Sequence, residues 1–213
     1  MRKYFVLMVF CMLALPASQA AEAVQWKEGV HYNEIPFPVT VETGKNIEVR
    51  EYFWYGCPHC FNLEPTINKW LKQKPKGAEF VRSPAILGPS WQIHAVAYFS
   101  YEALGIVDKM HGPTFIALHN DKRILNSVDD LADFVAKNGV DRAKFIKATN
   151  SFGVRVKLQH QMQLDRDAGI RSVPAIVVDG KYRTGADIAG SEENLIKLID
   201  YLVQKAKQER GKK

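Results

Sequence analysis

Residues 47–60 of this 213-residue chain read IEVREYFWYGCPHC, an apolar run that ends in a glycine and two closely spaced cysteines. The β-branched and aromatic side chains from Ile47 to Tyr55, with no breaker before Gly56, predict a buried strand. The residues after Cys57 predict a helix, and Pro58 suits its first position because a backbone N–H would have no partner there. The stretch therefore predicts a strand, a tight turn and a helix that begins at a C-x-x-C pair.

The position of Cys57 favours the ionised form of its thiol. Free backbone N–H groups and the positive end of the helix dipole stabilise an anion at a helix N-terminus. His59, between the two cysteines, can add a positive charge or a hydrogen bond. In such a setting the pKa of a cysteine falls from about 8.5 toward or below neutrality. Because a stable thiolate favours the reduced pair, the disulfide is expected to oxidise other thiols.

Three other interpretations of Cys57 and Cys60 remain open. They could form a structural disulfide, although closing so short a loop removes little chain entropy. They could contribute to a zinc site, although this needs two further ligands and the histidines lack ligand spacing. They could also be two reduced, buried and inert cysteines. The pattern favours dithiol–disulfide chemistry over all three.

Residues 1–20 read MRKYFVLMVFCMLALPASQA and predict a secretory signal peptide. Two basic residues precede an apolar stretch, Tyr4 to Leu15, that is too short to span a membrane, and small residues precede an expected cleavage site after Ala20. An uncleaved membrane anchor is the alternative. Cleavage would remove Cys11, so the exported protein would hold its only cysteines in the C-x-x-C pair, in an oxidising compartment.

The charge balance is mildly basic. The chain has a net charge of +6, and loss of residues 1–20, with two basic and no acidic side chains, would leave +4. Much of the excess lies in the C-terminal segment 205–213, KAKQERGKK, which we interpret as a solvated, fraying helix end. No arginine-rich stripe or aromatic RNA motif occurs, so we expect no nucleic-acid partner.

Outside the opening stretch, strand signals flank a long block of helical patterns. We expect short strands within 21–38 and at 79–82, 174–178 and 181–184, and helices at 61–71, 91–104, 114–119, 129–137, 141–149, 152–167 and from Ser191 onward. Asp129, Asp141 and Ser191 are the predicted N-caps, and Asp179-Gly180 predicts a type I′ hairpin turn.

These elements give an expected domain organisation. Residues 1–20 would be the signal peptide, 21–87 the first part of an α/β domain, 88–162 an inserted helical domain, and 163–213 the second part of the α/β domain. The length that remains after cleavage, about 190 residues, suits one domain with an insertion.

The CPHC pair, the distant RSVPA at 171–175, the helical insertion and the secretory signal together resemble the DsbA family of exported thiol:disulfide oxidoreductases from Gram-negative bacteria. The resemblance covers nearly the whole chain after residue 20. It implies an α/β, thioredoxin-like fold with a large inserted α-helical domain.

The resemblance also implies roles for individual residues. Cys57 matches the exposed nucleophile that forms a mixed disulfide with the substrate, and Cys60 matches its buried partner. Pro58 and His59 match the dipeptide that sets the redox potential. Two further residues match the segment that faces the cysteines, Val173, whose backbone pairs with an extended substrate, and Pro174, the cis-proline.

Glu51 lies on an apolar face of the predicted central strand. A buried carboxylate needs a partner or a raised pKa. In the family the matching acid lies below the cysteines and helps to move the proton of the buried thiol. Arg82 falls where the family usually has lysine and could pair with Glu51, but an arginine cannot give up a proton. A purely structural ion pair is the alternative.

The expected function is that of an oxidase in the periplasm. It would donate the Cys57–Cys60 disulfide to unfolded exported proteins through an apolar groove with loose selectivity, and would be reoxidised by a DsbB-like, quinone-linked inner-membrane protein. We expect a monomer without cofactor or metal. The alternatives are an exported dithiol reductase or isomerase, and a peptide-binding chaperone with incidental cysteines.

The aromatic residues 53–55 and Trp91 are expected in the core, and no role is assigned to five scattered histidines, His31, His94, His111, His119 and His160.

Overall fold

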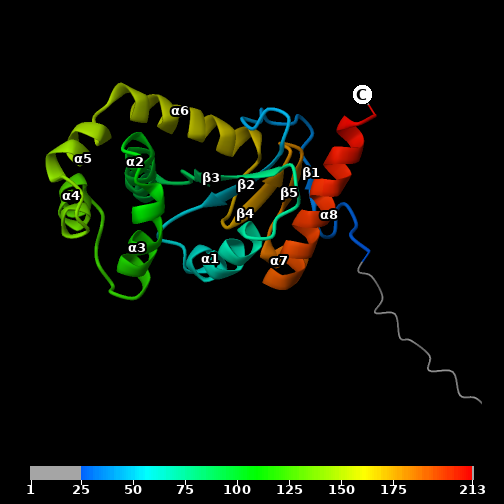
Figure 1. Ribbon diagram of the computed structural model, residues 1–213, viewed down its shortest axis with the longest axis horizontal. Coiled ribbons are helices and arrows are strands. Elements are labelled where there is room, and N and C mark those ends of the chain that lie inside the picture. Colours follow the sequence, from blue (N-terminus) through cyan, green and yellow to red (C-terminus); the bar gives the residue numbers. More distant parts are fainter. Residues whose placement is uncertain (1–24, 213) are drawn as a thin grey trace, which may run out of the picture.

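The computed structural model describes residues 25–212, and the predicted signal peptide lies outside this range. A five-stranded sheet in the order β1-β5-β4-β2-β3 forms its centre (Figure 1). The strands are β1 (Asn33–Glu34), β2 (Ile47–Phe53), β3 (Ala78–Pro84), β4 (Ala175–Val178) and β5 (Tyr182–Thr184). Among the strand pairs of this sheet in residues 25–212, β2–β3 is parallel and the others are antiparallel.

Strand β2 lies inside the sheet, between β4 and the edge strand β3, and all seven of its residues are buried. It ends at Phe53, two residues earlier than expected, and the chain then turns into α1 (Pro58–Leu71). Its register places Glu51 opposite Arg82 on β3 and Ile176 on β4. The acid expected at the centre of the sheet is therefore there.

Helices cover both faces of the sheet. On one face, Ile176 and Val178 pack against α1 and against α8 (Glu192–Arg210). On the other face, Ala175 and Val177 pack against the end of α6 (Phe152–Asp167) and the N-terminal arm. The alternation along β4 follows the period of two that side chains have in a strand.

The helical block lies between β3 and β4 and gathers at the end of the sheet away from α8 (Figure 1). It consists of α2 (Pro89–Ala103), α3 (Val107–His119), α4 (Val128–Lys137), α5 (Arg142–Thr149) and α6. Its core continues into Phe53, Tyr55 and both cysteines, which places the C-x-x-C pair where sheet and insert meet. The exact limits of a separate domain stay a prediction, since α6 runs unbroken through residue 162.

Two expectations about the insert are wrong. Helix α3 begins at Val107 rather than at Thr114, with Pro113 inside the helix, because the residues before it, including Met110, are buried against the core. Helix α4 is capped by Ser127, whose hydroxyl accepts a hydrogen bond from the backbone N–H of Asp130 at 3.1 Å. Asp129 is the second residue of the helix, where an acid still interacts favourably with the positive end of the dipole.

The C-terminal segment does not fray as expected. Helix α8 extends to Arg210, and its Ala206 is buried. The Arg210 Nε donates a hydrogen bond to Asp179 at 3.0 Å, and the Tyr182 hydroxyl donates to Glu209 at 2.6 Å. The basic tail is therefore docked on the β4–β5 hairpin, whose turn residues have the positive φ expected of a type I′ turn.

A short helix, α7 (Ala186–Ala189), was not predicted and follows β5 directly. The expected caps Asp141 and Ser191 are confirmed at the starts of α5 and α8. Within residues 25–212, none of the helices combines the length and apolar character needed to cross a bilayer.

Candidate active site

Cys57 is the N-cap residue of α1, and Pro58 occupies the first turn. The backbone of Cys57 is extended, with φ −89° and ψ 117°, and the Cys57 N–H donates a hydrogen bond to the Trp54 carbonyl at 2.9 Å. Both cysteines are free thiols in this structure. The Cys57 side chain is 8% exposed and Cys60 is fully buried. The expected difference in access is present, although Cys57 is largely covered rather than open.

The two thiols have opposite electrostatic environments. The pKa of Cys57 is lowered to about 6, chiefly by a hydrogen bond from the Cys60 thiol and then by the backbone N–H groups of Cys60 and His59. The positive charge of His59 contributes least of the causes that lower it, so this side chain matters less than the sequence suggested. Burial raises the pKa of Cys60 well above its usual value. Near pH 7 the pair therefore holds one thiolate and one thiol.

The segment before β4 faces the cysteines. The Cys57 Sγ lies 3.5 Å from the Val173 carbonyl oxygen, and the Val173–Pro174 peptide is cis. A cavity of about 440 Å³ opens beside this contact. Its lining comes from the start of α1, the segment before β4, α7 and the start of α8: His59, Asn62, Leu63, Ser172, Val173, Pro174, Ala186, Asp187, Ser191 and Glu192.

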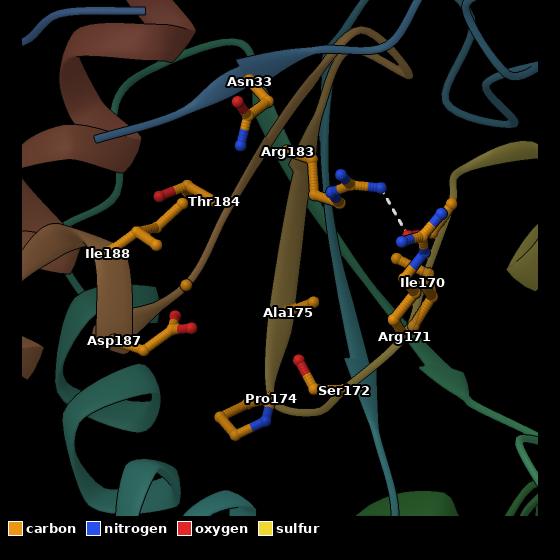
Figure 2. A pocket seen from close by; sticks show the side chains of 12 residues that line it. Asn33, Ile170, Arg171, Ser172, Pro174, Ala175, Arg183, Thr184, Asp187 and Ile188 are labelled. Atoms are coloured by element: carbon orange, nitrogen blue, oxygen red, sulfur yellow. Dashed lines mark hydrogen bonds between the residues drawn. The ribbon is translucent and has the colours of Figure 1, made fainter. Parts of the chain in front are cut away.

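A second hollow of about 180 Å³ borders the same segment and shares Ser172, Pro174 and Asp187 with the first cavity. Figure 2 shows Pro174 and Ser172 at one end of it, with Asp187 of α7 facing Pro174. At the other end, Arg183 donates a hydrogen bond to the carbonyl of Gly169. Ser172 and Pro174 line both hollows, whereas Val173 lines only the cavity beside Cys57.

Glu51 is fully buried below the cysteines, and neither of its carboxylate oxygens has a hydrogen-bond partner within the described residues. Arg82 Nε lies 3.6 Å from Glu51 Oε2, so the expected contact between the two side chains is present. Burial, and then the charge of Glu64, raise the pKa of Glu51 to about 8, while Arg82 opposes the rise. Glu51 therefore carries a proton at neutral pH.

The sequence did not predict the rest of this buried network. Arg82 Nη2 donates to both carboxylate oxygens of Glu64, at 3.1 and 3.3 Å. The His111 Nε2 lies 3.0 Å from Glu64 Oε1. One signal could have revealed Glu64, because it follows Cys60 by four residues and so shares its helix face. No comparable signal exists for His111, which lies 47 residues from Glu64 along the chain.

The aromatic residues expected in the core lie there only in part, since Trp54 and Trp91 are half-buried. Phe53 and Tyr55 are fully buried, and the half-buried Trp54 stacks on Trp91 with ring centroids 4.4 Å apart and planes at 9°. His119, given no role from the sequence, stacks on Phe61 and lies 2.8 Å from the Tyr55 carbonyl. In the part of the chain that the structure describes, no group of three or more His, Cys, Asp or Glu side chains could hold a metal ion.

Comparisons with known proteins agree with this geometry. The family model of the DSBA-like thioredoxin domain matches residues 83–195. The thiol:disulfide interchange protein DsbA of Pseudomonas aeruginosa is 38% identical over 201 residues, which cover 93% of this chain and 95% of that protein. The DsbA of Azotobacter vinelandii is 40% identical over 178 residues, 84% of this chain and 83% of its own.

Solved structures show the same fold. The crystal structure of Pseudomonas aeruginosa DsbA has a TM-score of 0.83 and 38% identity, and covers 88% of this chain and 97% of that chain. The structure of the oxidoreductase DsbA of Xylella fastidiosa has a TM-score of 0.78 and 30% identity, and covers 84% of this chain and 96% of that chain. The expected thioredoxin-like fold with a helical insert is confirmed.

Proposed function

The chain belongs to the DsbA family of thiol:disulfide interchange proteins and is a disulfide oxidoreductase, and we propose that it works as an oxidase of exported, unfolded proteins. The observation that carries this direction is the contrast between the two thiols. The pKa of Cys57 is lowered to about 6, whereas that of Cys60 is raised. A pair that is stable as a thiolate gives up its disulfide readily to other thiols.

The first step joins the client to Cys57. A client thiolate attacks the Cys57 sulfur, the Cys57–Cys60 bond breaks, and the Cys60 sulfur leaves with the electron pair. The buried Cys60 sulfur strongly favours its protonated form. Glu51, which is protonated at neutral pH, supplies that proton as a general acid.

The second step releases the client. A second client thiolate attacks the client's own sulfur in the mixed disulfide, and Cys57 leaves as a thiolate. Its low pKa makes it a good leaving group. Two electrons have then passed from the client to the cysteine pair, and the client holds a new disulfide.

Client binding would use the backbone next to the cysteines. Val173 offers its main chain beside Cys57, and the cavity of about 440 Å³ has room for client side chains. Main-chain pairing with an extended segment recognises any sequence, so selectivity should be loose. Pro58 and His59 would tune the potential, and Pro174 would shape the binding segment.

The remaining parts of the proposal rest on the family and on the predicted signal peptide. The protein would act as a monomer in the periplasm, without a bound cofactor. A DsbB-like, quinone-linked inner-membrane protein would reoxidise the cysteine pair, which sends the two electrons to a quinone.

An equilibrium titration against glutathione tests the direction of the reaction. We expect a reduction potential well above the value of about −270 mV that characterises reducing dithiol proteins. A potential at or below that value would identify a reductase. The Cys57→Ser variant should lose all dithiol oxidation, and full biological rescue by a Cys57→Ser, Cys60→Ser variant would instead favour the chaperone alternative.

A further inference from the structure

His111 is a buried titratable group that the proposed mechanism does not use. It lies on α3, is 6% exposed, and touches the network below the cysteines. The Tyr55 hydroxyl lies 2.9 Å from its Nδ1, and its Nε2 lies 3.0 Å from Glu64 Oε1. The imidazole therefore connects a phenol to a carboxylate in the interior of the protein.

The two contacts define one tautomer. A neutral imidazole has one donor and one acceptor nitrogen, and a carboxylate can only accept. The Nε2–H therefore donates to Glu64, and the Nδ1 accepts from the Tyr55 hydroxyl. Burial lowers the pKa of His111, so the ring stays neutral and keeps this arrangement at neutral pH.

This hydrogen bond makes the two buried carboxylates unequal. Glu64 receives donors from His111, from Arg82 and, at 3.3 Å, from Asn68. Within residues 25–212 Glu51 receives none, and the Arg82 Nε lies 3.6 Å from its Oε2. Two carboxylates that share one guanidinium divide charge and proton according to their other donors. The charge accordingly belongs on Glu64 and the proton on Glu51.

The pKa values agree with this division. Burial opposes ionisation of Glu64, but the hydrogen bonds from His111 and Arg82 outweigh it, and the pKa of Glu64 is lowered. The other titratable groups around the network are Tyr98 of α2, the Cys60 thiol of α1 and Asp108 of α3. Burial raises the pKa of Tyr98 and of Cys60, so both are neutral, and Asp108 is exposed.

We propose that His111 is a positioning residue for the acid of this reaction: its hydrogen bond holds the negative charge on Glu64, and so keeps on Glu51 the proton that Cys60 receives. The inference rests on the proposed role of Glu51. His111 touches neither cysteine nor client, and acts only through Glu64.

Two variants separate this role from simple packing. In His111→Gln, the side-chain amide can donate to Glu64 and accept from Tyr55, so both hydrogen bonds are kept in a neutral group. In His111→Phe, the ring fills the space but removes both. If the phenylalanine variant does not fold, His111→Asn replaces it, because its shorter amide does not reach Glu64.

The protonation of Glu51 is measured directly by titrating side-chain carboxyl carbon resonances of the reduced full-length protein, assigned with Glu51→Gln. In His111→Phe the midpoint of Glu51 should fall by about one pH unit, the order of a hydrogen bond to a charged group. As the pH is raised, the rate at which the oxidised protein forms a mixed disulfide with a cysteine peptide should begin to fall about one pH unit earlier in His111→Phe than in the wild type, because Glu51 loses its proton earlier. His111→Gln should match the wild type in both measurements.

An unchanged Glu51 midpoint in His111→Phe would overturn the inference, and so would an equal shift in His111→Gln. The thiolate titration of Cys57 serves as the control, because burial and contacts with Cys60 and His59 set its pKa. If Cys57 titrates normally in all variants while Glu51 does not move, His111 has no positioning role. A wild-type Cys57 that titrates like a free thiol contradicts the proposed function instead.

Discussion

The sulfur of Cys57 faces three hydrogen-bond donors of the same helical turn, which are the Cys60 thiol and the backbone N–H groups of Cys60 and His59. Backbone groups and a buried thiol hold their positions whatever the side chain at position 59. The thiolate is thus stabilised mainly by the way α1 begins, and the exposed His59 imidazole makes a smaller adjustment.

Replacement of this imidazole tests that ranking. In His59→Ala the pKa of Cys57 should rise, but by less than about one unit, because each unit corresponds to about 1.4 kcal/mol and an exposed charge contributes little. The oxidising power should weaken in proportion. Thiolate absorbance as a function of pH measures the shift. An unchanged pKa of Cys57 would show that the charge of His59 does not stabilise the thiolate.

Glu51 gives a second prediction at this scale. Its pKa is raised to about 8 by burial first, so between the pKa of an unfolded glutamate and that value Glu51 ionises in the unfolded chain but stays protonated in the folded one, and the folded state loses stability as the pH rises. Glu51→Gln removes this loss. In urea unfolding, the free energy of unfolding of the variant should exceed that of the wild type by more than about 1 kcal/mol at pH 9. The two free energies should differ little at pH 5. A variant that is less stable at pH 9 would contradict the raised pKa.

At the scale of single elements, the end of α8 is ordered and paired, whereas its sequence suggests a solvated, fraying end. The segment 205–213 is rich in lysine, yet Arg210 pairs with Asp179 and also reaches the carbonyls of Gly44 and Lys45, at 3.1 and 3.2 Å. Charge composition alone cannot show which basic residue of a tail has an acidic partner in a distant hairpin.

We therefore expect Arg210→Ala to lower the free energy of unfolding by about 0.5–1.5 kcal/mol, since hydrogen bonds to charged partners are lost at a partly exposed site. Lys212→Ala is the matched control, because Lys212 is exposed. Urea unfolding compares the two. Equal stability of both variants would mean that the tail frays in solution after all.

On the scale of the whole molecule, the site joins three parts of the fold. Helix α1 supplies the cysteines, the segment before β4 supplies the facing backbone, and α3 of the insert supplies His111. The thiolate of Cys57 exists only in the reduced protein. Its stabilisation should therefore raise the free energy of unfolding of the reduced form relative to the oxidised form.

The pH dependence of that stability has a defined sign. The pKa of Cys57 is lowered to about 6 in the folded reduced protein, against about 8.5 for a free cysteine. Its contribution is therefore complete above the unfolded value and is lost as the pH falls through 6. Thermal unfolding should find the reduced form more stable than the oxidised form at pH 8, with a gap that narrows by pH 5. A gap that widens toward pH 5 would refute this.

The sequence predicted the strand, the turn and the helix start, because these follow from local patterns and from the preference of Pro58 for a first helical turn. It also predicted a buried Glu51 from alternation along β2. It could not predict His111, since that contact depends on how the insert packs against α1. It misjudged the start of α3 because Pro113 reads locally as a boundary, whereas burial of its neighbours decides the observed one.

Helix α1 and its surroundings hold Cys57 of the reduced protein as a thiolate. The most direct measurement is a titration of thiolate absorbance in the reduced protein, with Cys57→Ser as the blank. We expect a single midpoint near pH 6 that disappears in the blank. A midpoint at or above about 8.5, the value of an unperturbed cysteine, would contradict it.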